Sequence, residues 1–408
     1  MAHREPLGLW LYDTHIATLT SKGGPGEVSV SFSEDAIERW AARSPILSCS
    51  LPLATKKTRA DEFFRGLLPE GRHLQAMASH AGVATFDTFS LLGRYGKDVA
   101  GAVVIADTDP GARLGEVIPY TAESLEEEIA GLPERPLGLY EDSELSIAGL
   151  QDKVLLVTLG DGRWGRPAHG APSTHILKVE GRLHPGMAEM EAGCLRIARA
   201  VGLSTVDADV QRIADLPCLI VSRFDRRVVA DGTVERLHQE DSCQALGKNP
   251  SSPNGKGKYE AYGGPTFAEI GGLLDLYAID ASTELEQLVK AATFTVIIGN
   301  ADAHGKNLAL LHHEDGGVVL APLYDTVPTV LWPKLRSTGA MSINGSSSLA
   351  TTTIDDLVTE AARWPLSEAR ARAAATACAS EILDTLNATA APEALKELVN
   401  ARARQLLA

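Results

Sequence analysis

The sequence predicts an α+β chain of two lobes in which strands come before helices. Hydrophobic residues make up 44% of the 408 residues, which suffices for sizeable cores and excludes wholesale disorder. Short alternating or continuously apolar runs, typical of strands, recur between residues 7 and 225. Beyond residue 238 the apolar residues recur with helical spacing. This order favours a small α+β domain, then a β-rich lobe, then an all-helical lobe.

The first 108 residues predict the small α+β domain. Period-two alternation indicates strands, and Ser33 precedes a short apolar stretch as the N-cap residue of a helix does. The expected strands lie at 7–12, 28–32 and 100–106, and the expected helices follow Ser33 and lie at 59–68, 72–80 and 86–94.

The middle region, 109–237, predicts the strands of the β-rich lobe. Apolar runs at 154–159, 175–179 and 219–225 are typical of buried strands, and a short acidic helix is expected near 125–129. A helix is expected at 187–201, because apolar residues recur there every three or four positions.

The last region, 238–408, predicts the helical lobe. One loop at 247–264, rich in Gly, Pro, Ser and Lys, interrupts the helical pattern and is long enough to be functional or mobile. The expected helices lie at 238–246, 266–276, 282–298, 355–364, 366–386 and 392–407.

Charge, cysteine content and hydropathy argue against several classes of protein. The formal net charge of −15 makes the chain a poor candidate for clamping a nucleic-acid backbone by itself. Its five cysteines are scattered and never spaced as C-x-x-C, so neither a disulfide framework nor a zinc site is indicated. No apolar run has the length of a membrane span, and the N-terminus lacks the core of a signal peptide. We therefore expect a cytoplasmic protein without a membrane partner.

The stretch 299–307 carries the clearest chemical pattern. Asp302 and Asn307 have the D-x-x-x-x-N spacing of phosphotransferase catalytic loops, in which Asp takes the proton of the attacking hydroxyl and Asn holds magnesium. Asp325, at the end of a later apolar run, adds a second oxygen ligand of the kind Mg²⁺ prefers. An isolated match is more often a turn whose side chains bond their own backbone, so the rest of the chain has to decide.

A lysine and a loop are the further elements that a protein-kinase-like fold would require. Lys178 lies inside an apolar strand, as does the kinase lysine that binds nucleotide phosphates and pairs with a helix glutamate. On the helix at 187–201, Glu191 borders the apolar stripe and is the expected partner, whereas Glu189 faces solvent. The stretch from Ser146 to Lys153 is the candidate phosphate-covering loop. A snorkelling lysine and an ordinary turn remain the alternatives.

Two further residues near these motifs have structural roles as their simplest interpretation. Asp225, within Arg223-Phe-Asp-Arg-Arg, is expected to pair with its neighbouring arginines. His304 is expected to bond the backbone of its own loop.

Eight segments of the chain resemble the motifs of one family. They occur in the family's order and are spread over nearly the whole chain. The segments are Gly66-Leu-Leu-Pro-Glu, Ser146-Ile-Ala-Gly-Leu-Gln-Asp-Lys, His175-Ile-Leu-Lys, Arg223-Phe-Asp-Arg, His238-Gln-Glu-Asp-Ser-Cys-Gln-Ala-Leu-Gly, Tyr262-Gly-Gly-Pro, Gly299-Asn-Ala-Asp-Ala-His-Gly-Lys-Asn and Tyr324-Asp. The family is the HipA serine/threonine kinases, the toxins of HipBA-type toxin–antitoxin systems. Each segment alone is weak evidence for the family, but the eight together are specific for it.

The resemblance implies a role for each matching residue. Asp302 would be the catalytic base, Asn307 and Asp325 would hold Mg²⁺, and Ser146 would be an autophosphorylation site whose phosphate inactivates the enzyme. The residues implied to surround ATP are Ile147, Ala148, Gly149, Lys178, Arg223, Phe224, Gln239, His304 and Lys306.

The resemblance also implies partners and a domain division. The partner would be a small helix-turn-helix antitoxin, through which alone the chain meets DNA. The substrate would be an aminoacyl-tRNA synthetase, most often the glutamyl enzyme, and its phosphorylation would arrest translation and growth. The expected domains are an N-terminal subdomain at 1–108, a kinase N-lobe at 109–237 and a C-lobe at 238–408. A small-molecule kinase and a nucleotide-binding regulatory subunit remain the alternatives.

Overall fold

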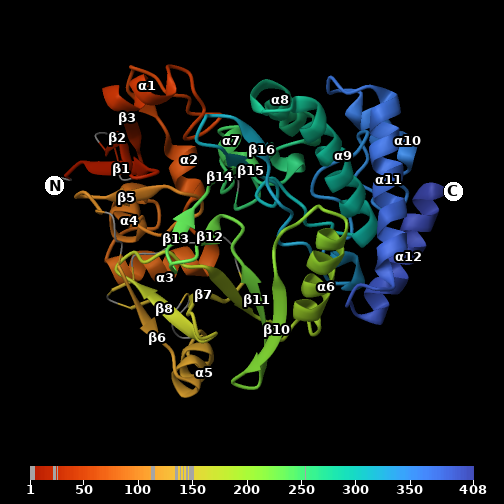
Figure 1. Ribbon diagram of the computed structural model, residues 1–408, viewed down its shortest axis with the longest axis horizontal. Helices are drawn as coiled ribbons and strands as arrows, with labels where there is room; N and C mark the ends of the chain where they lie inside the picture. Colours follow the sequence, from red (N-terminus) through yellow and green to blue (C-terminus); the bar gives the residue numbers. More distant parts are fainter. Residues whose placement is uncertain are drawn as a thin grey trace. The chain divides into compact units, whose positions relative to one another are not determined.

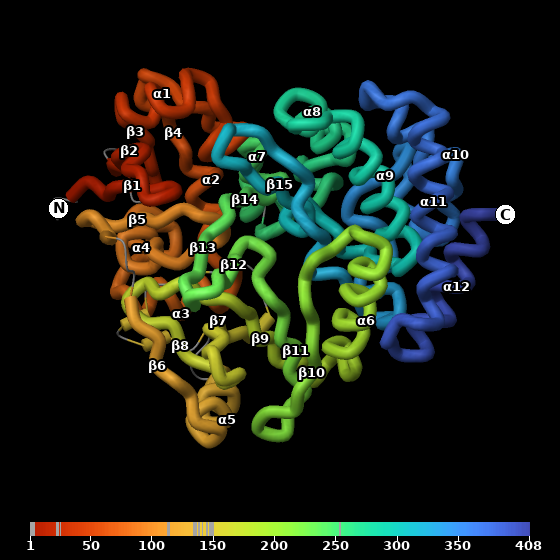
Figure 2. The backbone as a smooth tube through the Cα atoms, viewed as in Figure 1, coloured from red at the N-terminus to blue at the C-terminus, as the bar shows by residue number. Residues whose placement is uncertain are grey.

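The computed structural model describes residues 5–21, 24, 26–111, 115–133, 137, 139–140, 142–143, 146, 151–252 and 254–408 (Figures 1 and 2). The chain forms two compact units. The first comprises Met1–Val179, Arg212–Glu240 and Leu311–Gly317, and the second comprises Glu180–Gln211, Asp241–Leu310 and Val318–Ala408. No helix within the described residues is both long enough and apolar enough to cross a membrane.

The N-terminal part of the first unit is a five-stranded antiparallel sheet accompanied by four helices, coloured red to orange in Figure 1. The strand order is β4-β3-β2-β1-β5. Tyr12 and Asp13 turn the chain between β1 and β2 with φ of 48° and 60°, as a two-residue hairpin turn requires. The elements are β1 (Leu7–Leu11), β2 (Thr14–Thr20), β3 (Ser29–Phe32), α1 (Glu34–Trp40), β4 (Thr58–Arg59), α2 (Asp61–Gly66), α3 (Gly71–Ala81), α4 (Thr88–Tyr95) and β5 (Val104–Ala106).

A second, six-stranded sheet has the order β10-β11-β9-β7-β8-β6. Strand β9 lies in its interior and pairs antiparallel with β11 and β7, so Lys178 is carried by an inner strand of the sheet. The elements are β6 (Glu116–Pro119), α5 (Ala122–Ala130), β7 (Lys153–Thr158), β8 (Trp164–Ala168), β9 (His175–Val179), β10 (Ala208–Ile213) and β11 (Leu216–Ser222), followed by the separate pair β12 (Arg226–Val228) and β13 (Val234–Arg236).

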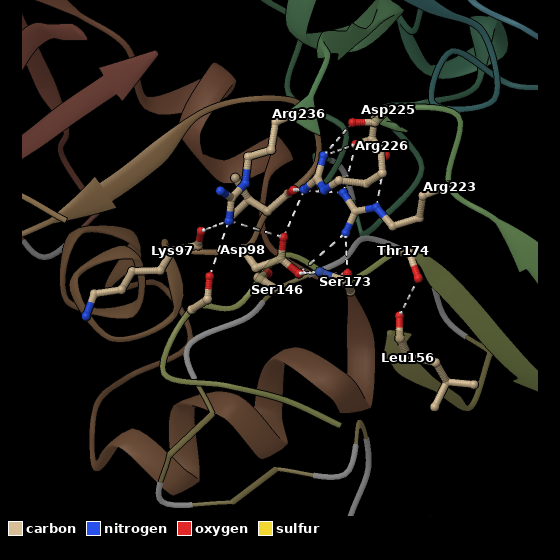
Figure 3. A network of polar contacts seen from close by, with 12 residues as sticks. Lys97, Asp98, Ser146, Leu156, Ser173, Thr174, Arg223, Asp225, Arg226 and Arg236 are labelled. Carbon is tan, nitrogen blue, oxygen red and sulfur yellow. Dashed lines mark hydrogen bonds and ion pairs between the residues drawn. The ribbon is translucent and has the colours of Figure 1, made fainter. Parts of the chain in front are cut away.

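A buried ion-pair network ties three distant segments of the first unit together (Figure 3). The Asp98 carboxylate accepts hydrogen bonds from Arg226 at 2.9 Å and from the Ser173 hydroxyl at 2.7 Å. Asp225 accepts one from Arg223 at 2.7 Å, which confirms its expected structural role. Burial opposes ionisation of Asp98, but the guanidiniums of Arg223, Arg226 and Arg236 outweigh it and lower the pKa of this carboxyl. Breaking such a buried pair typically costs about 3–5 kcal/mol, so the network fixes these segments firmly.

The second unit is built mainly from helices, with α9 at its centre. The 18-residue helix α9 is buried along most of its length and packs against α8, α10, α11 and α12. In Figure 1 these helices lie side by side in teal to blue. The helices are α6 (Met187–Ala200), α7 (Ser242–Ala245), α8 (Phe267–Tyr277), α9 (Ala281–Ile298), α10 (Ile354–Ala361), α11 (Glu368–Leu386) and α12 (Glu393–Leu407).

One expected helix is wrong. The stretch 238–246 begins as strand β14 (His238–Asp241), and only the four residues of α7 after it are helical. Asp241 ends the strand and starts the helix, since its side chain accepts the backbone N–H of Gln244 and Gln244 reciprocates in a capping box. Two more strands, β15 (Ala309–His312) and β16 (Val318–Leu320), join β14 in the order β14-β15-β16. The region beyond residue 238 is therefore mainly but not entirely helical.

Candidate active site

The loop 299–307 starts where α9 ends. Gly299 caps α9 in the left-handed conformation, with φ of 69°, which a glycine adopts without the steric cost of a Cβ. Two hydrogen bonds then hold the backbone of the loop. Ala301 N donates to the Thr329 hydroxyl at 2.8 Å, and Asp302 N donates to the Asn300 side chain at 3.1 Å. The Asp302 carboxylate is thus presented on a fixed turn.

The Asp302 carboxylate has charged and polar neighbours from the same unit. The Tyr259 hydroxyl donates a hydrogen bond to its Oδ1 at 2.8 Å. Burial raises the pKa of Asp302, and the negative charge of Asp325 adds to this effect. The Tyr259 hydrogen bond and the cations Lys258 and Arg336 act in the opposite direction without cancelling the rise. An aspartate with a raised pKa is a stronger base than an exposed one, which suits proton abstraction.

Asn307, the last residue of the loop 299–307, contacts Asp325, which lies beyond β16. The Asn307 side-chain amide donates to Asp325 Oδ2 at 2.9 Å, so the two predicted metal-binding side chains meet. Asp325 is exposed and Asn307 is buried. An amide oxygen and a carboxylate side by side offer the hard oxygen donors that Mg²⁺ takes in phosphoryl-transfer sites, where phosphate oxygens and water complete the shell. The donor set therefore fits magnesium.

Lys306 and His304 lie between the two ends of the loop. The Lys306 ammonium pairs with Asp241 at 2.8 Å. The backbone N–H of His304 donates to Asp302 O at 2.8 Å, and its carbonyl accepts from Asn307 N at 2.8 Å. Burial lowers the pKa of His304 to about 3, so the imidazole is neutral at physiological pH. Any residue could make these two backbone hydrogen bonds, so the structural role of the His304 side chain stays a prediction.

Sequence reasoning missed three residues of this site. Lys258 and Tyr259 come from the loop at 247–264, whose length and Gly-, Pro-, Ser- and Lys-rich composition do not single out these two residues. Tyr259 packs edge-on against His304, with ring centroids 5.2 Å apart. The Arg336 guanidinium lies 5.0 Å from the centre of the Tyr259 ring. Asp302 is 43 positions away from Tyr259 in the sequence, so no local pattern could reveal the contact.

The first unit contains the other predicted residues. Lys178 is buried in β9, where it faces Lys153 of β7 and Leu219 of β11. The Ser146 hydroxyl is fully buried and donates to Leu67 O at 2.9 Å, while Ser146 N donates to Asp98 O. Of the expected phosphate-covering loop, Ile147, Ala148 and Gly149 lie outside the described residues.

Three more expected nucleotide contacts also belong to the first unit. The Arg223 guanidinium is occupied by Asp225, Ser173 and the carbonyl of Val99. Phe224 follows it directly after β11, and Gln239 lies on β14.

The expected lysine partner lies on α6. Glu191 is buried there while Glu189 is exposed, as the helical periodicity predicted. Lys178 and Glu191 belong to different compact units, so their pairing stays a prediction.

Comparison with known proteins identifies the family. Residues 145–390 match the HipA-like C-terminal domain and residues 7–106 match the HipA N-terminal domain. The first of these alone spans more than half of the chain. The chain belongs to the HipA family. The resemblance carried by the eight sequence segments is therefore confirmed.

Relatives of known name agree with this HipA assignment. Y4mE of Sinorhizobium fredii, named as a candidate kinase, is 37% identical over 354 residues, covering 84% of this chain and 82% of its own. The serine/threonine-protein kinase toxin HipA of Shewanella oneidensis is 29% identical over 351 residues, covering 83% of this chain and 78% of its own. Kinase activity is thus supported at the level of the HipA family.

A solved structure shows the same fold. The HipA toxin–antitoxin complex of Shewanella oneidensis MR-1, with HipB and its operator DNA, matches with a TM-score of 0.78 and 25% sequence identity. The match covers 98% of this chain and 96% of that one. The predicted α+β, kinase-like fold class is confirmed, and the family implies the use of ATP.

Proposed function

We propose that this chain is an ATP- and Mg²⁺-dependent protein serine/threonine kinase and the toxin of a type II toxin–antitoxin module. The observation that carries the proposal is the contact between Asp325 and Asn307 at the end of the fixed loop that also carries Asp302, in a HipA-family chain. The hydrogen bond from the Tyr259 hydroxyl to Asp302 Oδ1 supports the proposal, because it shows that this carboxylate can accept a hydroxyl donor. The second carboxylate oxygen is then oriented for a substrate hydroxyl.

The proposed mechanism is positioning combined with charge neutralisation. Asp302 accepts the proton of a serine hydroxyl as that oxygen bonds to the γ-phosphorus of ATP, and the bond from this phosphorus to the β–γ bridging oxygen breaks. Asn307 and Asp325 hold Mg²⁺, which neutralises phosphate charge when bound. Lys178, paired with Glu191, binds the phosphates.

Contacts to the rest of the nucleotide form a second part of the proposal. From the family resemblance we infer that Arg223 and Phe224 meet adenine. Their backbone rather than the Arg223 guanidinium would make this contact, since the guanidinium already binds Asp225 and Ser173. The remaining residues proposed to surround ATP are Ile147, Ala148, Gly149, Gln239, His304 and Lys306.

The proposed partners follow from the family. The Shewanella relative is named a kinase toxin, and its solved structure contains HipB and operator DNA. We infer a small helix-turn-helix antitoxin as partner and DNA contact through it alone. The proposed substrate is an aminoacyl-tRNA synthetase of the cytoplasm, the glutamyl enzyme first, whose phosphorylation arrests growth. The proposed functional domains are 1–108, 109–237 and 238–408.

Two matched substitutions test the catalytic assignment. Asp302→Asn should lower phosphorylation by about 10²-fold or more, because it removes the base, and should leave Mg-ATP binding intact. Asp325→Asn should lower activity as strongly and also weaken Mg-ATP binding. The measurements are phosphate transfer from labelled ATP to proteins of a cell lysate and calorimetric titration with Mg-ATP. Asp275→Asn, an exposed change on α8, is the control. Substantial turnover in Asp302→Asn would sink the assignment, and label appearing only in small molecules would favour the small-molecule kinase.

Ser146 gives a separate prediction. Its hydroxyl is fully buried against Leu67 O, so phosphorylation requires this residue to leave its site. A phosphate adds nearly two negative charges, which cannot return to a buried position without a cationic partner. We expect incubation with Mg-ATP to add one phosphate at Ser146 and to weaken subsequent ATP binding.

Intact mass and peptide mapping, followed by ATP titration of the phosphorylated protein, measure this effect. Ser146→Ala should stay unmodified and active, and Asp302→Asn should stay unmodified and inactive. A phosphorylated protein that binds ATP as tightly as the unmodified one would show that no switch operates.

A further inference from the structure

Three side chains of the first unit that play no part in the proposed kinase chemistry converge in a buried cluster. Cys49 comes from the segment after α1, Glu240 from β14 and His312 from β15. One ligand atom of each lies within 4.8 Å of those of the other two, and all three residues are buried. The cluster unites a thiol, a carboxylate and an imidazole. These groups are far apart in the sequence, which explains why cysteine spacing gave no hint of a metal.

The hydrogen bonds around Glu240 position the cluster. Glu240 Oε1 lies 3.0 Å from His312 Nε2 and accepts the backbone N–H of Cys49 at 2.8 Å. Glu240 Oε2 accepts the Ser48 hydroxyl at 2.6 Å. Two ligands of one tetrahedral zinc ion, each about 2.0–2.2 Å from the metal, stand about 3.3 Å apart. The separation of the carboxylate and imidazole therefore already approaches that of two ligands on one ion.

The imidazole of His312 also has the freedom that a metal ligand needs. Its Nδ1 is buried and makes no hydrogen bond with any residue that the structure describes. When Nε2 gives up its proton to bind a cation, the ring proton can move to Nδ1 without breaking another contact. The Tyr12 hydroxyl meanwhile holds the backbone carbonyl of His312 at 3.0 Å, which fixes the position of the residue.

Ligand chemistry selects the ion. Calcium and magnesium take oxygen ligands, so a thiol and an imidazole disfavour both. A thiolate, an imidazole and a carboxylate together suit Zn²⁺, which binds such sets tetrahedrally and accepts water as a fourth ligand. We propose that Cys49, Glu240 and His312 form a zinc site that clips the segment around Cys49 to β14 and β15. Binding releases the proton of the Cys49 thiol to solvent and leaves no oxidation change.

The alternative to a zinc site is a metal-free, hydrogen-bonded cluster in which the Cys49 thiol keeps its proton. Burial, reinforced by the neighbouring Glu240, raises the pKa of the Cys49 thiol, so without a cation the sulfur is protonated. A bound divalent cation reverses that preference, because it stabilises the thiolate directly. The two states thus differ in one measurable property, the presence of a metal–thiolate bond.

Cobalt substitution of the full-length, untagged chain tests the proposal. After dialysis against excess Zn²⁺ and desalting, the wild type should retain one zinc per chain, measured by elemental analysis. Co²⁺ in place of zinc should give a thiolate-to-cobalt charge-transfer band and visible bands of tetrahedral cobalt. Zinc should also raise the melting temperature.

Variants assign the ligands. Cys49→Ser and His312→Asn should lose the charge-transfer band and most of the retained metal. Cys218→Ser and Cys378→Ser are matched controls, because they remove other buried thiols and should keep both signals. The proposal is overturned if the wild-type protein retains less than one tenth of an equivalent of zinc, or if its cobalt form shows no charge-transfer band. Both results come from the wild type, so they hold even if a variant fails to fold. The readouts need no kinase activity, so they are independent of the proposed function.

Discussion

The Tyr259 hydroxyl is the contact that most directly sets the chemistry of Asp302. It donates to Oδ1 at 2.8 Å, and this hydrogen bond lowers the pKa of a carboxyl that burial raises. Lys258 and Arg336 act in the same direction as Tyr259, whereas Asp325 acts against it. A base must be ionised to accept a proton, so activity should fall as the pH falls through the pKa of Asp302.

Removing this hydroxyl gives a prediction with a definite sign. In Tyr259→Phe the pKa of Asp302 should rise further, because the ionised carboxylate loses a donor. The acidic limb of the pH profile should therefore move to higher pH. Separately, kcat at neutral pH should fall about tenfold, because the carboxylate loses the hydrogen bond that positions it. The measurement is kcat against pH for wild type and variant.

Tyr262→Phe provides the matched control, since Tyr262 belongs to the same loop and is 45% exposed. Its profile should equal that of the wild type. If Tyr259→Phe keeps both the wild-type rate and the wild-type acidic limb, Tyr259 does not position the base.

Single residues also show where sequence reasoning ends. The role of Asp225 followed from the arginines beside it, and the structure confirms these ion pairs. The opposite faces of Glu189 and Glu191 followed from helical periodicity. The contact between Tyr259 and Asp302, and the cluster of Cys49 with His312, depend on chain segments that only tertiary folding brings together. Local patterns carry no information about such pairs.

Among the elements, the catalytic loop depends on close packing at Gly305. A Cβ atom there would lie 2.3 Å from Cγ of the Pro265 ring, so the backbone would have to move. Two hydrogen bonds oppose that movement: Gly305 N donates to Lys258 O at 3.0 Å, and Gly305 O accepts from Ser242 N at 3.0 Å. The loop between Asp302 and Asn307 is thus held by a glycine that a larger residue cannot replace.

Gly305→Ala should therefore lower kcat by about tenfold or more, because a shift of about 1 Å in a catalytic group has effects of this order. Steady-state kinetics and thermal unfolding measure the effect. Gly272→Ala is the matched control, since a Cβ atom added to this exposed glycine of α8 would have no neighbour within 4 Å among the described residues. The control should keep full activity and gain about 0.5–1 kcal/mol of stability from helix propensity. Unchanged kinetics in Gly305→Ala would contradict the packing argument.

Helices were predicted accurately where apolar residues recur with helical spacing over many turns. Helices α9 and α11 begin and end within two residues of their expected bounds, because each runs over about five turns of apolar spacing and ends at a capping residue. The expected helix at 238–246 failed for the opposite reason. Four residues of strand, the last of them Asp241, are followed directly by four of helix, and so short a run does not separate the two periods.

At the scale of the whole molecule, family membership was the most secure sequence inference. Eight separate segments in a fixed order constrained the fold more than any secondary-structure pattern, and the fold class is confirmed. The mixture of helices and strands beyond residue 238 was only partly predictable. Strands β15 and β16 have four and three residues, which is too short for a period-two pattern to stand out.

Net charge leads to a prediction about DNA. Phosphate contacts supply most of the affinity of DNA-binding proteins, and they require clustered lysines and arginines. This chain carries 53 acidic against 38 basic residues, a formal charge of −15. The Shewanella HipA structure contains HipB together with its operator DNA. We expect the isolated chain to give no sequence-specific gel shift at physiological salt, and a small basic antitoxin encoded beside it to restore one.

The measurement is a titration of labelled operator DNA with the chain alone, with the antitoxin alone and with both, in the presence of unlabelled competitor. If the chain contributes only through its partner, the combined shift should move to a larger complex, while its salt dependence should stay close to that of the antitoxin alone, because the number of neutralised phosphates is nearly unchanged. A markedly steeper salt dependence would mean that basic residues of this chain touch the backbone. An operator-specific shift by the chain alone would show that a local basic surface outweighs its net charge.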